Sequence, residues 1–167
     1  MNKQDLIQQL INAYSEAYAK QGHSSLMGKI VALLIASPEP LSLDQISERL
    51  QMSKGPISQI SRKLKDHNLI EKVWIPGERK DFYRASPDIF GQAFANYAAS
   101  MKKNMQMAAQ FSELVEHLDM KDNQTDHIKS RMEEMKQFYE LMNEYNRNFL
   151  DAWQETIKPQ LKKTPQI

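Results

Sequence analysis

Two short helices joined by a tight turn are predicted between residues 42 and 67, and this pair constrains the fold more than any other stretch. The first begins with a capping-box pattern, Ser42 followed by Gln45, in which each side chain accepts a hydrogen bond from the other residue's backbone N–H. A turn follows Leu50, and Ser53 is expected to cap the second helix through its hydroxyl. A helix, a tight turn and a second capped helix predict a helix-turn-helix.

The second of these helices, SKGPISQISRKLKDH, has one apolar stripe and one cationic face. Ile57, Ile60 and Leu64 fall at helical spacing, and no acid occurs on the other face before Asp66. The residues of this helix that we predict to contact DNA are Ser53, Lys54, Gly55, Ser58, Gln59, Arg62 and Lys63. Such a helix suits a major groove, although a solvated surface helix would explain the same run of charge.

A β-hairpin is predicted directly after the helix-turn-helix. Residues 69–75 alternate roughly between apolar and polar and are rich in β-forming types, and residues 81–85 form the return strand. The turn between them, PGERK, places Arg79 and Lys80 near the hairpin tip, so we predict that both contact DNA. A hairpin with basic residues at its tip in this position is typical of the wing of a winged helix.

This segment carries a local excess of positive charge. Residues 53–84 contain eight basic and four acidic side chains, a local excess of +4 in a chain of 167 residues whose total is +1. A nucleic-acid site must therefore come from local clustering of charge, because the whole protein is not a polycation.

The N-terminal part of the chain predicts two more helices. Residues 2–20 have one apolar face, and this helix would pack either on its own domain or on a second chain. Residues 25–37 are apolar nearly all round after Lys29, so this helix should be the buried centre of the domain. Two prolines within residues 37–41 predict that the helix stops there.

Two long helices are predicted in the C-terminal half. One starts at Ser86 and runs to about Asp119, and after a polar turn over 122–125 another runs from about Asp126 until Pro159. Each would be about 45–50 Å long at 1.5 Å per residue. Their apolar stripes outreach a domain this small, which predicts a helical hairpin that also pairs with a second chain.

The order of these elements, with the sequence SLDQISERLQMSKGPISQISRKLKDHNLIEKVWIPGERKDFY, resembles the GbsR branch of the MarR-type bacterial transcriptional regulators. The resemblance is strongest over residues 28–90 and rests on the MSKG step, the R-x-L-x-x-x-x-L-I run and the wing VWxPGxRKDFY. It implies a homodimer whose N- and C-terminal helices form the interface, and two winged domains that bind a palindromic operator. It also implies control of genes for compatible-solute uptake and synthesis, with choline-like ligands in some members.

We therefore expect a mainly α-helical fold with a small β-hairpin wing. Its parts would be an N-terminal dimerisation helix (1–24), a winged helix-turn-helix DNA-binding domain (25–87) and a C-terminal helical dimerisation region (88–167). The expected function is sequence-specific transcription regulation, as a repressor, by a homodimer that binds double-stranded DNA. The alternative is a winged-helix module that docks on protein without contacting DNA.

A quaternary ammonium effector would need an aromatic cage, because such cations bind the faces of aromatic rings. The candidate rings on the two long helices are Phe90, Phe94, Tyr97, Tyr139, Tyr145, Phe149 and Trp153. The same helical spacing is typical of core and dimer-interface residues, so the effector site is left unassigned.

Catalysis and metal binding have little support. The four His are far apart, with no pair at metal-ligand spacing, and there is no Cys, phosphate loop or nucleophile elbow. We expect no enzymatic activity, no metal and no cofactor. The polar N-terminus is unlike a signal peptide, and no apolar run would span a bilayer. A cytoplasmic protein without a membrane partner, located at the nucleoid when bound to DNA, is therefore expected.

Overall fold

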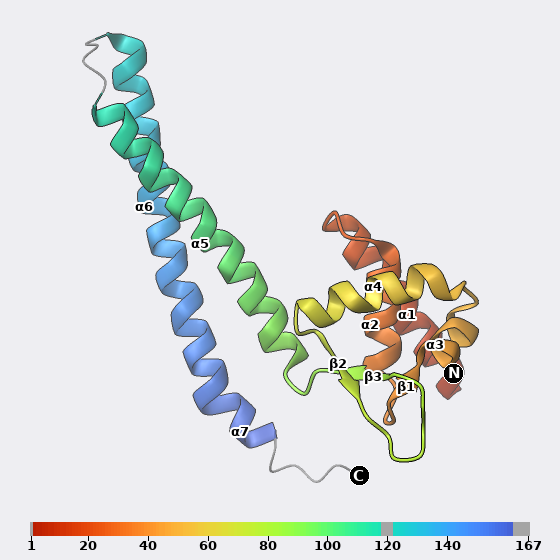
Figure 1. The fold of residues 1–167 in the computed structure, drawn as a ribbon. Coiled ribbons are helices and arrows are strands. Elements are labelled where there is room, and N and C mark those ends of the chain that lie inside the picture. Colours follow the sequence, from red (N-terminus) through yellow and green to blue (C-terminus); the bar gives the residue numbers. More distant parts are fainter. Residues whose placement is uncertain (1, 118–121, 162–167) are drawn as a thin grey trace. The chain divides into compact units, whose positions relative to one another are not determined.

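The chain forms two compact units, Met1–Gln92 and Ala93–Ile167. The structure, a computed structural model, describes residues 2–117 and 122–161 (Figure 1). The elements are α1 (Lys3–Lys20), α2 (Ser25–Ile35), β1 (Leu41–Ser42), α3 (Leu43–Leu50), α4 (Lys54–Asp66), β2 (Ile70–Val73), β3 (Phe82–Ala85), α5 (Ile89–Glu116), α6 (Asn123–Ala152), the π-helical turn η1 (Trp153–Ile157) and α7 (Lys158–Leu161). The boundary between the units falls inside α5.

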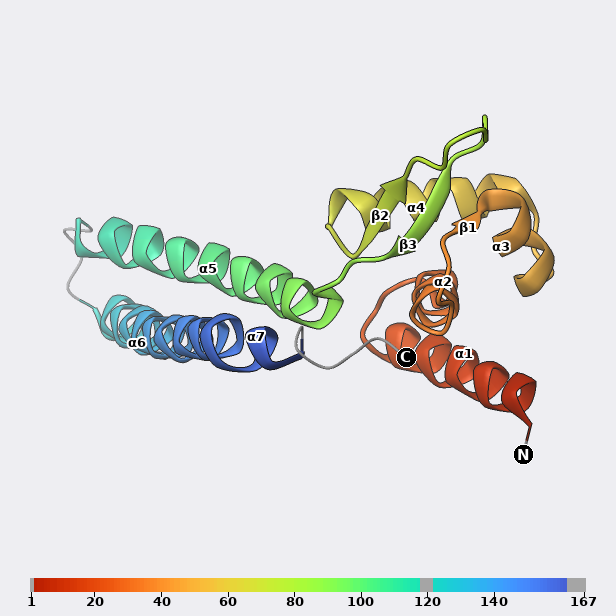
Figure 2. The same cartoon turned by 90° about the horizontal axis from the view of Figure 1, so that it is seen from below.

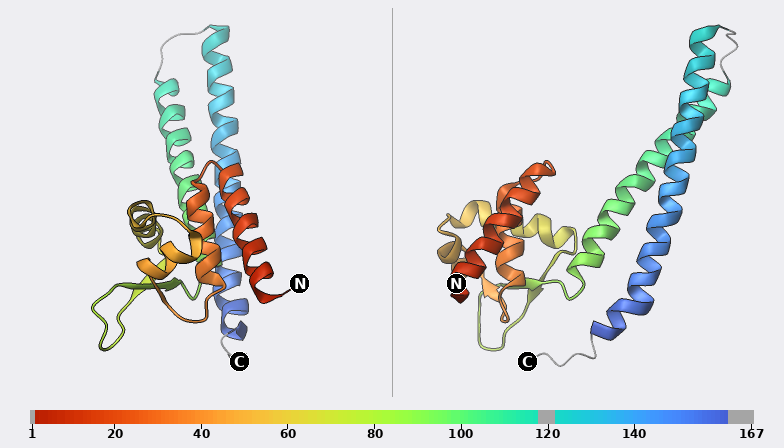
Figure 3. Two further views of the ribbon diagram at one scale, coloured as in Figure 1. Left: turned by 90° about the vertical axis from the view of Figure 1, so that its right-hand side faces the viewer. Right: turned by 180° about the vertical axis from the view of Figure 1, so that it is seen from behind.

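Helix α2 is the buried centre of the first unit, which confirms the prediction from its composition. Ile30 and Leu34 are 0% and 2% exposed, because apolar side chains surround the helix on nearly every side. Helices α1, α3 and α4 and strand β3 all contact it. The sequence left open whether the N-terminal helix packs on its own domain or on a second chain, and α1 lies along α2 of its own chain (Figures 2 and 3).

Gly28 allows α1 and α2 to approach closely, a role that the sequence did not reveal. A Cβ atom at this position would lie 2.3 Å from the backbone oxygen of Tyr14 and 2.9 Å from the backbone nitrogen of Ser15. Since both atoms belong to the backbone of α1, no side-chain rotation could relieve the overlap. The packing distance between the two helices therefore depends on the absence of a side chain at Gly28.

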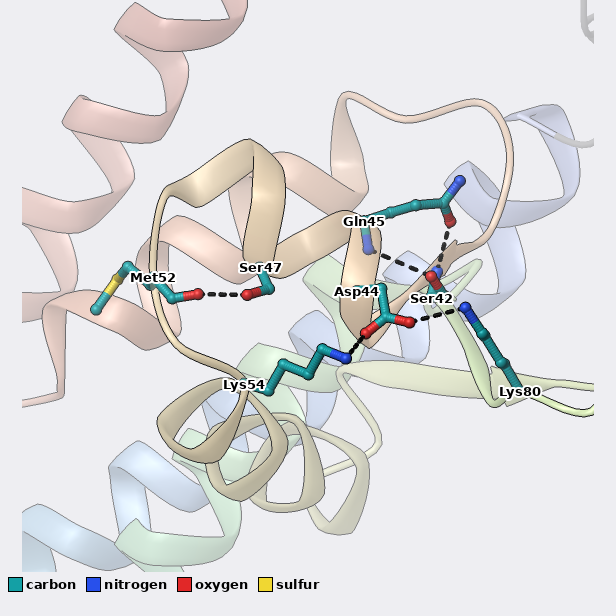
Figure 4. Close-up of polar contacts among 7 residues, drawn as sticks. All are labelled: Ser42, Asp44, Gln45, Ser47, Met52, Lys54 and Lys80. Carbon is teal, nitrogen blue, oxygen red and sulfur yellow. Dashed lines mark hydrogen bonds and ion pairs between the residues drawn. The ribbon is translucent and has the colours of Figure 1, made fainter.

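The helix-turn-helix is held by hydrogen bonds at both ends of α3. The predicted capping box is confirmed: the Gln45 N–H donates to Ser42 Oγ (3.2 Å), and the Ser42 N–H donates to Gln45 Oε1 (2.8 Å). After α3, Gln51 adopts the left-handed conformation (φ 52°). The Ser47 hydroxyl donates to the carbonyl oxygen of Met52 (Figure 4). These bonds fix the direction in which the chain leaves α3 and enters α4.

Three short antiparallel strands, in the order β1-β3-β2, complete the first unit. Strands β2 and β3 form the predicted hairpin, with Val73 opposite Phe82. The prediction that residues 37–41 are only a stop was incomplete, because Leu41 belongs to β1 and pairs with Tyr83. A two-residue strand is too short to show an alternating pattern in the sequence. Strand β1 nevertheless joins the start of α3 to the base of the wing.

The second unit is a hairpin in which α5 and α6 run side by side (Figures 1 and 2). The rings of Phe94 and Phe149 lie 4.5 Å apart between centroids, and the Asn104 amide donates to the Tyr139 hydroxyl (3.5 Å). The buried residues of this unit, among those described, are Ala108, Val115 and Thr125. Two helices alone thus cover little of their apolar surface.

The first long helix begins later than predicted. Helix α5 starts at Ile89, because a turn closed by a hydrogen bond from the Ile89 N–H to the Ser86 carbonyl oxygen (3.1 Å) comes first. The predicted end near Asp119 lies outside the described residues.

The second long helix begins earlier than predicted and is interrupted near its end. Helix α6 starts at Asn123, because the Asp122 carboxylate accepts a hydrogen bond from the Thr125 N–H (2.8 Å). The expected polar turn over 122–125 is therefore the cap and first turn of the helix. The expected continuous helix up to Pro159 contains the π-helical turn η1, which follows Ala152.

Together these elements form a winged helix-turn-helix and a hairpin of long helices, the mainly α-helical fold class that the sequence predicted. Among residues 2–117 and 122–161, no helix combines the length and the apolar character needed to cross a membrane.

Replacing Gly28 with alanine should destabilise the protein, since the new methyl group would push α1 away from α2. We expect a net loss of about 1–3 kcal/mol, after alanine's better helix propensity has offset up to about 1 kcal/mol. Urea unfolding followed by circular dichroism measures the change. Gly55→Ala is the matched control, because nothing lies within 4 Å of a Cβ atom there. Equal stability of the two variants would contradict the role of Gly28.

Candidate nucleic-acid interface

Helix α4 has one buried apolar face and one exposed basic face, as the sequence predicted. Ile57, Ser61 and Leu64 are fully buried against the rest of the first unit. The exposed residues of the helix that were predicted to contact DNA are Lys54, Gly55, Gln59, Arg62 and Lys63. Ser58 is half-buried, so its hydroxyl is the least accessible of the predicted set. The exposed face of α4 therefore offers amide, guanidinium and ammonium groups.

Ser53 occupies the cap position of α4 without capping it, which corrects the prediction for this side chain. Its backbone is extended (φ −67°, ψ 150°), but its hydroxyl accepts no capping hydrogen bond. A cap side chain normally bonds the N–H of the second or third helical residue. The third residue of α4 is Pro56, which has no N–H. The exposed Ser53 hydroxyl is thus available to a ligand.

The wing beyond the sheet is a loop from Trp74 to Asp81 that extends past the strands (Figure 3). Gly77 at its turn has φ +84°, and the Glu78 N–H donates to the Ile75 carbonyl oxygen (3.1 Å). Arg79 and Lys80, both predicted to contact DNA, are exposed in this loop.

Trp74 is 77% exposed at the start of the wing loop, which sequence reasoning did not single out. The sequence prediction extended the strand through Ile75, but β2 ends at Val73. Trp74 therefore lies beyond the paired part of the hairpin.

Asp44, at the start of α3, joins the beginning of α4 to the wing (Figure 4). Its Oδ1 pairs with the ammonium of Lys54, and its Oδ2 lies 2.8 Å from the ammonium of Lys80. Hydrogen bonds from Lys54 and then Lys80 lower the pKa of Asp44 to about 2. The hydrogen bond between Lys80 and Asp44 also raises the pKa of Lys80. The structure thus brings two of the predicted DNA contacts to one carboxylate.

The exposed face of α4 itself carries no acid before Asp66, but Asp44 of α3 pairs with Lys54 at the start of that face. Sequence inspection of α4 alone could not find Asp44, because the acid comes from the preceding helix. Within the sequence, Asp44 is an ordinary acid near the positive end of a helix dipole.

Other cations of the wing are paired within the hairpin. Lys72 lies 2.8 Å from Asp81, whose hydrogen bond raises the pKa of Lys72, and Arg84 lies 2.9 Å from Glu71. By contrast, the first unit's described acids form no ion pair with four further cations, namely Arg62, Lys63, Lys65 and Arg79. Half of the basic side chains between residues 53 and 84 are therefore available for phosphate contacts without a competing acid.

The candidate aromatic cage is only partly assembled. The ring of Phe94 lies 5.9 Å from that of Tyr97 and 4.5 Å from that of Phe149, so three candidates come together. Tyr139 instead contacts Phe138 at 5.3 Å. Among the described rings, Phe90 and Tyr145 share no contact with this group and are 58% and 68% exposed. Three rings from two helices could form one side of a cation site.

A cavity of about 680 Å³ lies elsewhere, in the first unit beside α1 and the end of α2. Its apolar lining includes Ile7, Ile11 and Leu33, and its charged lining residues are Lys3, Glu39 and Arg49. None of its lining residues is aromatic, so this cavity does not fit the expected cage.

Comparison with known proteins relates the chain to helix-turn-helix regulators. It is 32% identical over 94 residues to the HTH-type transcriptional repressor OpcR of Bacillus subtilis (strain 168), covering 56% of this chain and 51% of that protein. It is 29% identical over 102 residues to the putative HTH-type transcriptional regulator YvaV of the same organism, covering 59% and 58%. The HTH-type transcriptional regulator MmpR5 of Mycobacterium tuberculosis (strain ATCC 25618 / H37Rv) is 23% identical over 111 residues, covering 66% and 63%.

The aligned part spans only about half to two thirds of the length of these relatives. No family model matches the chain. A solved structure described as the crystal structure of a transcriptional regulator superposes with a TM-score of 0.74 at 19% identity, covering 89% of this chain and 98% of that one. In sequence the chain is thus similar to proteins named as helix-turn-helix transcription regulators, and its fold is that of a solved transcriptional regulator.

Proposed function

We propose that this chain is a DNA-binding transcription regulator that uses α4 and the wing together. The observation that carries the proposal is that Lys54 on α4 and Lys80 on the wing meet at one carboxylate, that of Asp44. Arg62 and Lys63 on α4 and Arg79 on the wing are also exposed. Lysine and arginine ammonium and guanidinium groups bind DNA phosphates without regard to sequence, while amide and guanidinium groups on a helix read base edges. The names of the relatives support the same conclusion.

The protein would act as a homodimer that binds a palindromic operator. Apolar side chains on the second unit support this, since Leu114, Phe138 and Leu141 are each more than half exposed. A second copy of the hairpin, together with the N-terminal helix, would cover that surface. The parts proposed from the sequence, 1–24 and 88–167 for dimerisation and 25–87 for DNA binding, describe this assembly.

Within this proposal the protein is a cytoplasmic repressor of the GbsR-like, MarR-type branch. The motifs of residues 28–90 support the branch, and the name of the repressor OpcR supports the sign of regulation. A choline- or betaine-like effector is supported by the cluster of Phe94, Tyr97 and Phe149.

A second candidate function is docking on another protein through the same fold. The observation that favours it is Trp74, a large apolar side chain that is 77% exposed beside the wing. Retention on heparin at rising salt, followed by a gel shift with the DNA upstream of the protein's own gene, separates the two functions. A protein-docking module would leave heparin at low salt and shift no DNA.

Arg79→Ala should weaken binding to upstream and random DNA almost equally, because we expect the Arg79 side chain at the wing tip to contact the phosphate backbone of the DNA. In a dimer the substitution removes two phosphate contacts, so the slope of log K against log salt should become shallower by about 1.8. A salt titration on both DNAs measures it. An effect on the upstream DNA alone would refute the assignment.

Gln59→Ala should weaken binding to the upstream DNA but not to random DNA, since the Gln59 amide lies on the exposed face of α4 where base edges come within reach. We expect a loss of about 1–3 kcal/mol per half-site on the upstream DNA and little change on random DNA. The same titration provides the comparison, with Arg79→Ala as the control. Equal losses on both DNAs would assign Gln59 to the phosphate backbone instead.

Light scattering at low micromolar concentration should give about twice the chain mass of 19.4 kDa. Replacing Leu114 with glutamate should shift the protein toward the monomer, because a charge would enter an apolar interface. Gln106→Glu, at an exposed polar residue of the same helix, is the control for added charge. A wild-type monomer under these conditions would exclude the proposed assembly.

Calorimetry with choline and glycine betaine at millimolar concentration should give measurable heat, and ligand should change DNA affinity by roughly 5–150-fold. Phe149→Ala should abolish that heat, since it removes the ring closest to Phe94. No heat and no shift in melting temperature for the wild type would leave a regulator without this effector.

A further inference from the structure

Asp44 forms an ion pair with Lys54 at the start of α4 and another with Lys80 of the wing. The three residues of this cluster come from three different elements: α3, α4 and the loop between β2 and β3 (Figure 4). The two oxygens of Asp44 each take one ammonium, which is also the way in which the oxygens of a phosphate group bridge two lysines.

The wing loop has few other attachments near its tip. Its strands pair only at its base, from Ile70 to Val73 and from Phe82 to Ala85, and within the loop one turn is closed by the Glu78 N–H. The other ion pairs of the hairpin stay within it. Among the ion pairs of the described residues, the pair between Lys80 and Asp44 is the one that joins the wing to the helix-turn-helix.

We propose that Asp44 is an internal substitute for a DNA phosphate, which occupies Lys54 and Lys80 in the free protein and must release them when a nucleic-acid backbone binds. This inference rests on the proposed function. Both lysines remain more than half exposed in their pairs, at 64% and 61% of the side chain, so a phosphate can reach them. Asp44 is then a positioning residue that acts through these two lysines.

The consequence is that Asp44 weakens sequence-independent DNA binding more than operator binding. Any DNA, whatever its sequence, must compete with Asp44 for the two ammonium groups, and the released carboxylate then takes up a solution cation. Operator DNA gains additional contacts from base edges that random DNA does not make. Asp44 would therefore lower the background of sequence-independent binding without removing a base contact.

Asp44→Asn is the test, because it keeps the shape of the side chain and removes its charge. The probe is a mixed-sequence 30-base-pair duplex, with affinity measured over a range of salt concentrations. We expect the variant to bind at least about threefold more tightly at low salt, as two surface pairs are no longer in competition. The slope of log K against log salt should steepen by about 1 per protomer.

Glu48→Gln is the matched control, since it removes one exposed negative charge from the same helix, where no described ion pair involves Glu48. The gain from Asp44→Asn should also vanish when Lys54 and Lys80 are both replaced by glutamine. Trypsin offers a readout that does not involve DNA: cleavage after Arg79 or Lys80 should be faster in Asp44→Asn than in the wild type and in Glu48→Gln.

The outcomes separate this inference from the function on which it rests. If the wild type binds the duplex in a salt-dependent way but Asp44→Asn binds no more tightly than Glu48→Gln, the role of Asp44 is refuted and DNA binding stands. If the wild type does not bind the duplex at all, the proposed function fails and the phosphate analogy fails with it. Unchanged tryptic cleavage would show that Asp44 does not hold the wing.

Discussion

The burial of α2 on all sides is the constraint on which the winged unit depends. A helix with apolar side chains around its whole circumference is stable only when every side is covered. Helices α1, α3 and α4 and strand β3 together provide this cover, since all of them contact α2. Each fully buried aliphatic side chain of α2 contributes about 1.5–3 kcal/mol relative to an exposed one. The exposed face of α4 is therefore oriented by the same contacts that bury Ile57 and Leu64.

In the second unit, by contrast, most of the described apolar side chains are not buried. Its two long helices bury little, and aromatic and aliphatic side chains remain in solvent along both of them. Since helices in proteins owe most of their stability to packing of an apolar face, a two-helix hairpin of this length needs more cover than it provides itself. The stability of the first unit thus comes from its own core, while the stability of the second unit requires a partner that covers its apolar surface.

Local patterns in the sequence predicted the elements of the winged unit, and contacts between distant residues escaped prediction. The capping box of Ser42 and Gln45 lies within four residues, so it could be predicted from the sequence alone. The pairing of Leu41 with Tyr83 and the contact of Gly28 with the backbone of Tyr14 depend on the tertiary fold.

The candidate site shows the same division. The sequence predicted which side chains of α4 face solvent, because helical spacing decides that. It missed Asp44, whose partners lie 10 and 36 residues further along the chain. The prediction that Ser53 caps α4 was wrong, and part of the reason is visible in the sequence: Pro56, three residues later, has no N–H and so removes one of the two donors that a capping hydroxyl normally bonds.

The exposure of Trp74 gives the wing an optical label of its own. The chain has only two tryptophans, and the other, Trp153, lies in the π-helical turn of the second unit. An indole that is 77% exposed emits as a water-solvated chromophore, and any molecule that covers it changes the wavelength and intensity of that emission. With Trp153 replaced by phenylalanine, the fluorescence spectrum would report on the surroundings of the wing alone.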